Sequence, residues 1–336
     1  MSTTGSTPQQ NRSLPATPLS PSWAASTPIH EHPSIQVHGL RCRYGEHEAV
    51  KGIDLEIATG EIFALLGPNG AGKTTTVEIL EGFRKRSDGQ VSVLGVDPVH
   101  GGAQWRARIG VVLQESHPEP ELRVRECVAL YAGYYRRPRP IMETLELVGL
   151  GELADRRCEQ LSGGERRRLD VSLALVGDPE LLFLDEPTTG FDPAARRDAW
   201  ELVLSLRELG KTIVLTTHYM EEAERLADRI AVLADGQIVA TGTPQTLGAR
   251  ELMDVEISFA LPAGLSLVDL PVSLAATALS DGRRTVLRVE DPVSPLFTLT
   301  RWAFECNVEL PSLEVHRPSL EDVYLQLTER HEEAHR

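Results

Sequence analysis

The amino-acid sequence predicts an α/β protein with a mostly parallel sheet, followed by a smaller α+β unit. Residues 61–66 are mostly apolar and lead directly into a glycine-rich loop. Two further apolar runs, residues 181–184 and 212–217, end in a pair of carboxylates and in His218. Apolar runs of this length, without polar alternation, are typical of parallel strands that are covered on both faces.

Composition allows one large domain or two ordinary ones, because the chain has 336 residues, of which 41% are hydrophobic. The chain has 34 Lys and Arg against 49 Asp and Glu, which gives a net charge of −15. This acidic balance argues against broad nucleic-acid binding, so no nucleic-acid partner is expected. The four cysteines lack CxxC spacing, which favours neither a disulfide framework nor a zinc site.

Two regions bear on targeting. Residues 1–33 are rich in Ser, Thr, Pro and Gln, and lack the apolar core of a secretion signal, so we expect a disordered tail. The richest apolar stretch, residues 171–184, is interrupted by residues 177–180 and falls short of the roughly 18 apolar residues that span a bilayer. Any membrane role would therefore depend on a partner.

A small, mainly antiparallel sheet is expected at the start of the globular part. Ile35 and Val37, and later Ile53, Leu55 and Ile57, alternate with polar residues. Such alternation is typical of strands with one buried face.

The glycine-rich loop at residues 67–74 matches the phosphate-binding pattern G-x-x-x-x-G-K-[ST] at every position. Its glycines let the backbone N–H groups face phosphate oxygens, and the helix that starts at Thr74 adds partial positive charge. Lys73 is placed to reach the β and γ phosphates, and the Thr74 hydroxyl to ligate Mg²⁺. The residues expected to contact the nucleotide here are Gly67, Pro68, Asn69, Gly70, Ala71, Gly72, Lys73, Thr74 and Thr75.

Asp185 and Glu186 follow the apolar run 181–184 immediately. The carboxyl end of a central parallel strand borders the ligand crevice in folds of this class. Asp185 is therefore expected to reach the metal, directly or through water. The alternative interpretation is two solvated carboxylates at a strand end.

A second glycine-rich helix start lies at residues 161–165, before this acidic strand. Ser162 and Glu165 have the spacing of a capping box. Capping does not explain Gly163 and Gly164, which cost helix stability and suggest close approach of another group to the backbone.

Together, residues 161–165, the phosphate-binding loop and the acidic strand resemble the ATP-binding cassette (ABC) family, with a specific match over residues 35–244. The resemblance implies ATP and Mg²⁺ as cofactors. It implies a P-loop NTPase fold with a RecA-like, mostly parallel core, an antiparallel β subdomain and an inserted helical subdomain. The corresponding ranges are 34–246 for the cassette and about 115–165 for the helical subdomain.

Roles for further residues follow from the resemblance only. It makes Glu186 the general base that polarises the attacking water, and His218 the switch histidine that contacts the γ phosphate. Gln114, after the apolar run 109–113, would sense Mg²⁺ and this water. Tyr44 would stack on adenine, and the alternative is that it is a tyrosine on a half-buried strand. The implied metal ligands are Thr74, Gln114 and Asp185, and the residues that would contact the γ phosphate of the other protomer are Ser162, Gly163 and Gly164.

The chain departs from the commonest family pattern in three places. Glu165 stands where glutamine is usual, Phe191 replaces a leucine, and Arg123 occupies a position that is often threonine. Only Glu165 adds a carboxylate near a phosphate, so it is the substitution that bears on ATP affinity and turnover. The run 166–168 of arginines is interpreted as solvated charge or as a partner contact.

A small α+β domain is expected at residues 247–328, before a charged tail at 329–336. Alternation and apolar spacing predict strands near 255–261, 285–289 and 308–315, a helix at 296–304 and a closing helix at 319–328. The closing segment resembles the tail of ATP-binding subunits of daunorubicin-resistance-type exporters, which pair with a type-2 permease.

The resemblance therefore implies a cassette that dimerises, with a second copy or a paralogous cassette, and drives a separate integral membrane permease. Such a subunit would lie on the cytoplasmic face of the cell membrane, bound through the permease, and would power export of a drug-like or lipophilic compound. A soluble ABC ATPase of the translation or repair type is the alternative. A P-loop kinase is a third possibility, although it should lack the motif at residues 161–165.

Overall fold

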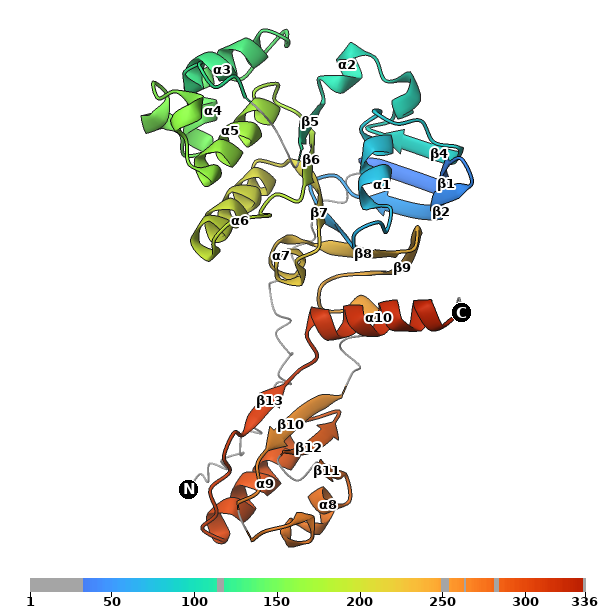
Figure 1. The fold of residues 1–336 in the computed structure, drawn as a ribbon, viewed down its shortest axis with the longest axis vertical. Coiled ribbons are helices and arrows are strands. Elements are labelled where there is room, and N and C mark those ends of the chain that lie inside the picture. Colours follow the sequence, from blue (N-terminus) through green and yellow to red (C-terminus); the bar gives the residue numbers. More distant parts are fainter. Residues whose placement is uncertain (1–32, 114–117, 249–253, 263, 281–283, 335–336) are drawn as a thin grey trace, which may run out of the picture. The chain divides into compact units, whose positions relative to one another are not determined.

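The computed structural model describes residues 33–113, 118–248, 254–262, 264–280 and 284–334. Its central element is a six-stranded sheet with the order β5-β6-β7-β3-β8-β9. Figure 1 labels β5, β6, β7, β8 and β9 of this sheet. All neighbouring pairs are parallel except β8 and β9. The bounds are β3 Ile62–Leu66, β5 Ile109–Val112, β6 Leu181–Asp185, β7 Thr212–Thr217, β8 Arg229–Ala234 and β9 Gln237–Gly242.

The expected antiparallel sheet is present, with the order β2-β1-β4. Its strands are β1 Ile35–Tyr44, β2 His47–Ile57 and β4 Asp88–Val93. The apolar residues that alternate along β1 and β2 share one core with β3 and with α1, Lys73–Leu80. This sheet therefore packs beside the phosphate-binding loop.

The inserted segment is helical, as predicted. α3 (Val124–Ala132), α4 (Ile141–Leu147) and α5 (Gly163–Leu175) pack on one another and join the core of the parallel sheet. The remaining cassette helices are α2 Ala103–Arg106, α6 Pro193–Glu208 and α7 Met220–Leu226. The observed architecture confirms the predicted fold class.

A separate core lies in the C-terminal part, where a four-stranded antiparallel sheet has the order β11-β12-β10-β13. The strand expected near 255–261 is present as β10 Val255–Phe259, two residues shorter than predicted, and the strand expected at 285–289 is β12 Thr285–Val289. The helix expected at 296–304 is α9, Val293–Glu305. β11 (Ala278–Ser280) and the short helix α8 (Val272–Ala275) were not predicted.

The strand predicted over residues 308–315 is wrong in extent, since only Glu314–His316 form β13. Pro311 cannot donate a backbone hydrogen bond, and Ser312 has a φ of 56°. Both features interrupt a ladder of strand hydrogen bonds.

The closing helix α10 spans Leu320–Ala334 and is longer than predicted. We expected it within the small domain, but its apolar face packs on the cassette. Leu320 and Tyr324 belong to the core that contains β3, β7 and β8, and Val323 and Leu327 lie beside Gly248. None of the helices among the described residues is long and apolar enough to cross a membrane.

Candidate functional site

The phosphate-binding loop connects β3 to α1, so residues 67–75 lie in this loop and the first turn of the helix. Its glycines are required by close packing. A Cβ atom at Gly67 would lie 2.3 Å from the carbonyl oxygen of Leu233, and one at Gly72 would lie 2.5 Å from that of Ala49. Gly72 also has a φ of 102°, which side chains rarely allow. The loop is thus a bare, tightly curved backbone in front of a helix N-terminus.

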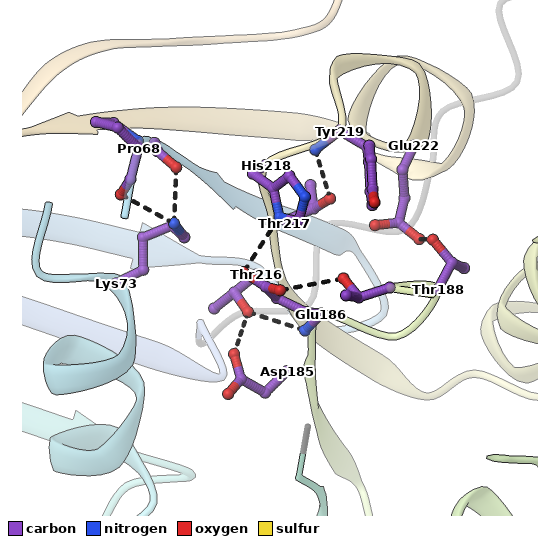
Figure 2. Close-up of polar contacts among 12 residues, drawn as sticks. Pro68, Lys73, Asp185, Glu186, Thr188, Thr216, Thr217, His218, Tyr219 and Glu222 are labelled. Atoms are coloured by element: carbon purple, nitrogen blue, oxygen red, sulfur yellow. Dashed lines mark hydrogen bonds and ion pairs between the residues drawn. The ribbon is translucent and has the colours of Figure 1, made fainter. Parts of the chain in front are cut away.

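Lys73 lies across this loop rather than in solvent. Its Nζ donates to the carbonyl oxygens of Gly67 at 2.7 Å and Pro68 at 3.1 Å (Figure 2). Burial lowers the pKa of Lys73, and the charges of Glu186 and Asp185 oppose that change. A buried ammonium beside a curved run of N–H groups fits the phosphates of a nucleotide.

Asp185 and Glu186 lie at the end of β6, where the side chain of Thr216 in β7 forms a hydrogen bond with each residue. The Thr216 hydroxyl donates to Asp185 Oδ1 and accepts from the Glu186 backbone N–H at 3.1 Å (Figure 2). The Glu186 N–H also donates to the Thr216 carbonyl oxygen at 3.1 Å. Asp185 and Thr74 supply oxygen atoms, the ligand type that Mg²⁺ prefers.

The backbone of Glu186 has a φ of 44°, in the left-handed region. For a residue other than glycine this conformation costs on the order of 1–3 kcal/mol, and it persists only where the surroundings enforce it. The Thr189 hydroxyl donates to Glu186 Oε2 at 3.1 Å, and His218 Nδ1 lies 3.2 Å from Glu186 Oε1. The structure thus places the predicted base and the predicted switch histidine in contact.

Tyr44 lies at the end of β1, and its hydroxyl is 3.1 Å from Thr75 Oγ1 in α1. The Arg84 guanidinium covers its ring at 4.8 Å from the centroid. Tyr44 is therefore beside the phosphate-binding loop, and adenine stacking stays a prediction. Gln114 follows β5 and lies outside the described residues.

The start of α5 forms the predicted capping box. Ser162 Oγ accepts from the Glu165 N–H at 3.3 Å, and Glu165 Oε2 accepts from the Ser162 N–H at 2.8 Å. The hydrogen bond from the Ser162 backbone is the main reason that the pKa of Glu165 is lowered, and Arg156 lies 3.6 Å away. The Glu165 carboxylate is thus bound back onto its own helix.

Among the described residues, none gives Gly163 or Gly164 a steric reason to be glycine. A Cβ atom at Gly163 would meet nothing within 4 Å, and one at Gly164 would only touch Ala195 at 3.8 Å. Both residues line a cavity of about 400 Å³ together with Gly190, Phe191 and other residues of α5, β6 and α6. The phosphate-binding loop is not part of the lining of this cavity.

We expect Glu165→Gln to change the Kd for MgATP and kcat by less than about threefold, because glutamine also completes a capping box. Glu165→Ala should lower the stability of α5 by about 1 kcal/mol through loss of the cap. Nucleotide titration and thermal unfolding of both variants check this. A tenfold or larger gain in affinity for Glu165→Gln would mean that the carboxylate repels bound phosphate.

Arg167 and Glu222 are buried charged residues of this region that the sequence analysis did not identify as buried. Arg167 is 9% exposed, although the run 166–168 was interpreted as solvated charge or a partner contact, and Glu222 in α7 is fully buried. A signal existed, because Arg167 lies four residues before the buried Val171 of α5, on the same helix face. Glu222 similarly precedes the buried Leu226 by four residues.

Comparisons with known proteins show which family the chain resembles. A family model described as ABC transporter matches residues 50–189, and one described as ABC transporter domain-containing protein-like, C-terminal domain, matches residues 255–319. The daunorubicin resistance ATP-binding protein DrrA3 of Streptomyces coeruleorubidus is 38% identical, over 88% of this chain and 96% of that protein. The Nod factor export ATP-binding protein I of Ralstonia nicotianae is 41% identical, over 90% and 96%.

Solved structures are similar over the cassette. An ATP-binding cassette of an ABC transporter in its ADP conformation has a TM-score of 0.57 and 26% identity, and covers 63% of this chain and 91% of its own. A dimeric cassette in a post-hydrolysis state, bound to ADP and Pi, has a TM-score of 0.56 and 27% identity, and covers 62% and 98%. The chain therefore belongs to the ABC transporter family, as one of its ATP-binding, ATP-hydrolysing subunits.

Proposed function

We propose that this chain is the ATPase subunit of an export system, bound through a separate permease to the cytoplasmic face of the cell membrane. The observation that carries the proposal is the likeness, along nearly the whole chain, to proteins named for daunorubicin resistance and Nod factor export. By this analogy the exported molecule is a drug-like or lipophilic compound. The proposal includes a cassette at 34–246 and a tail at 1–33. The accessory domain and charged tail expected at 247–328 and 329–336 are amended, because α10 (Leu320–Ala334) packs on the cassette.

In the proposed mechanism the N–H groups of the phosphate-binding loop and Lys73 bind the phosphates. Thr74 and Asp185, with Gln114, would hold Mg²⁺, which neutralises phosphate charge when bound. Glu186 accepts the proton of the attacking water, and His218 orients its carboxylate through the contact at 3.2 Å. Thr216 fixes Asp185 and Glu186 relative to each other.

We propose that a complete site needs a second cassette, as a homodimer or with a paralogous chain. The open space around Gly163 and Gly164 supports this, because a glycine that no intramolecular contact requires is explained by a group that approaches from outside. Ser162, Gly163 and Gly164 would then contact the γ phosphate bound to the partner. Dimer closure and reopening would drive the permease between two states.

A groove on the cassette is our proposed docking site for a short permease helix. Its cavity measures about 450 Å³ and its lining includes parts of α3, α5 and β5. Phe83, three residues after α1, is 73% exposed. Tyr134, two residues after α3, is 77% exposed and its ring lies edge-on to the ring of the lining residue Tyr131. Exposed aromatic side chains at an apolar groove are typical of protein interaction sites. The lining residues are Glu81, Gly82, Phe83, Arg106, Ile109, Gly110, Val111, Tyr131, Tyr135, Leu173 and Ala174.

A photo-crosslinking amino acid at position 83, introduced into the chain in its native host, tests this docking. We expect a cross-linked product with a membrane protein that has several spans. The same probe at Phe304, which is 88% exposed on α9, is the control and should not give that product. A ribosomal or DNA-repair partner at position 83 would instead favour the alternative of an ATPase that is not coupled to transport.

A further inference from the structure

The strained base segment, Asp185–Thr188, is held from two sides by residues outside the predicted site. On the first side is Arg167 of α5. Its Nη2 donates to the Asp185 carbonyl oxygen at 2.8 Å and its Nε to that of Pro187 at 3.3 Å. Its Nη1 donates to the Leu113 carbonyl oxygen at the end of β5. One buried guanidinium therefore binds three backbone carbonyls at two neighbouring strand ends.

On the second side is Glu222 of α7. Its Oε1 accepts from the Thr188 hydroxyl at 2.8 Å (Figure 2). The same oxygen accepts from Trp200 Nε1 of α6 at 3.3 Å. Burial raises the pKa of Glu222, and the side chains of Thr217, Thr188 and Trp200 oppose that rise. A buried acceptor of this kind is costly unless it is hydrogen-bonded, so these contacts fix Thr188 relative to α7.

The elements that supply these two residues are informative. Arg167 lies on the helix that begins with Gly163 and Gly164, and Glu222 lies on the helix that follows His218. Within one chain, the base segment is therefore hydrogen-bonded to α5 and to α7. These are the two helices that would respond to a bound γ phosphate. Neither Arg167 nor Glu222 is among the residues that would touch the nucleotide.

We propose that Arg167 and Glu222 are positioning residues that hold Glu186 in its left-handed conformation and so set the geometry of the hydrolytic step. This inference rests on the proposed role of Glu186 as the base. A carboxylate displaced by about 1 Å from the attacking water loses on the order of 100-fold in rate, because proximity is a large part of such catalysis. Loss of either contact should therefore act on kcat and leave nucleotide binding in place.

Matched neighbours in the same helices provide the controls. Arg167→Met and Glu222→Met should lower kcat by about 10–100-fold, with KM for ATP within about threefold. Arg166→Met and Glu221→Met change exposed residues of the same type and should keep kcat. In Glu222→Gln, kcat should stay within about threefold of the wild-type value, since the amide oxygen still accepts from Thr188 and Trp200. Steady-state ATPase assays and thermal unfolding of each variant measure this.

Thr188→Val gives a test that does not depend on a buried charge. It removes the hydroxyl at constant size, and we expect a kcat loss of about tenfold that Thr188→Ser avoids. Unchanged kcat in Arg167→Met, Glu222→Met and Thr188→Val overturns the inference. It is also overturned if kcat and ATP binding fall together with the melting temperature, which is the behaviour of a purely structural contact.

A double-mutant cycle separates this inference from the proposed role of Glu186. In Glu186→Gln, adding Glu222→Met should not slow the residual hydrolysis further, because a positioning residue acts through the group that it positions. Full additivity would overturn the inference alone. Wild-type turnover in Glu186→Gln itself would instead overturn the assignment of the base.

Discussion

Glu186→Gln is expected to lower kcat for ATP hydrolysis by about 10²–10⁴-fold, the usual contribution of a general base, while the Kd for MgATP changes by less than about threefold. The amide has the size of the carboxylate and still accepts from the Thr189 hydroxyl, but it cannot take a proton from water. Nucleotide binding depends on Lys73 and the loop backbone, which the substitution leaves intact. Single-turnover hydrolysis and equilibrium nucleotide titration measure the two effects.

The matched control is Glu208→Gln, which changes an exposed glutamate at the end of α6. It should leave both kcat and Kd unchanged. Loss of nucleotide binding in Glu186→Gln would show that this carboxylate organises the phosphate site, and a wild-type rate would exclude it as the base.

Gly163→Ala is expected to abolish hydrolysis while it preserves or raises the stability of the free subunit. A Cβ atom at this position meets nothing within 4 Å, and alanine is favoured over glycine in a helix by up to about 1 kcal/mol. No described residue of the same chain would collide with the added methyl group, so we expect the collision to be with a group from a second chain. Thermal unfolding of the variant and its ATPase rate should therefore move in opposite directions.

Mixing Gly163→Ala with a second inactive variant, Lys73→Ala, tests whether the two motifs act across a dimer. A mixed dimer has one site in which the intact loop of one chain meets the intact Gly163 of the other. Because half of the dimers in an equal mixture are mixed and each has one good site, activity should recover to about a quarter of wild type. Gly67→Ala is the contrasting variant, since its Cβ atom would lie 2.3 Å from Leu233 O within the same chain. Absence of recovery would place both motifs in the same chain's site.

The parallel core was predictable because its strands are buried on both faces and therefore appear as unbroken apolar runs. The motifs also fixed which residues meet at the sheet edge, since parallel strands end on the same side. Sequence did not reveal how Asp185 and Glu186 are held. Thr216 is one more residue of an apolar strand in the sequence, and only the pairing of β6 with β7 shows that its hydroxyl bonds both the Asp185 carboxylate and the Glu186 backbone N–H.

The errors outside the site have local causes. β11 and β13 have only three residues each, too few for a periodic pattern to be recognised. The sequence correctly predicts the apolar face of α10 but not the surface that this face covers. Amphipathicity carries no information about which surface an apolar helix face packs on. Arg167 was misinterpreted because charge runs are usually solvated, whereas in α5 the rotation of the helix turns one arginine of the run inward.

The packing of α10 makes the small four-stranded domain an insertion within the cassette rather than an appendage at its end. The chain leaves the cassette after Leu247 and returns to it at Leu320, and both residues lie in the same core. The cassette core is therefore complete only once the inserted domain and the segment from Leu320 onward have both been synthesised. The inserted domain is also restricted because two chain segments join it to the cassette, one after Leu247 and one before Leu320. Any rotation of the domain must be accommodated by both segments.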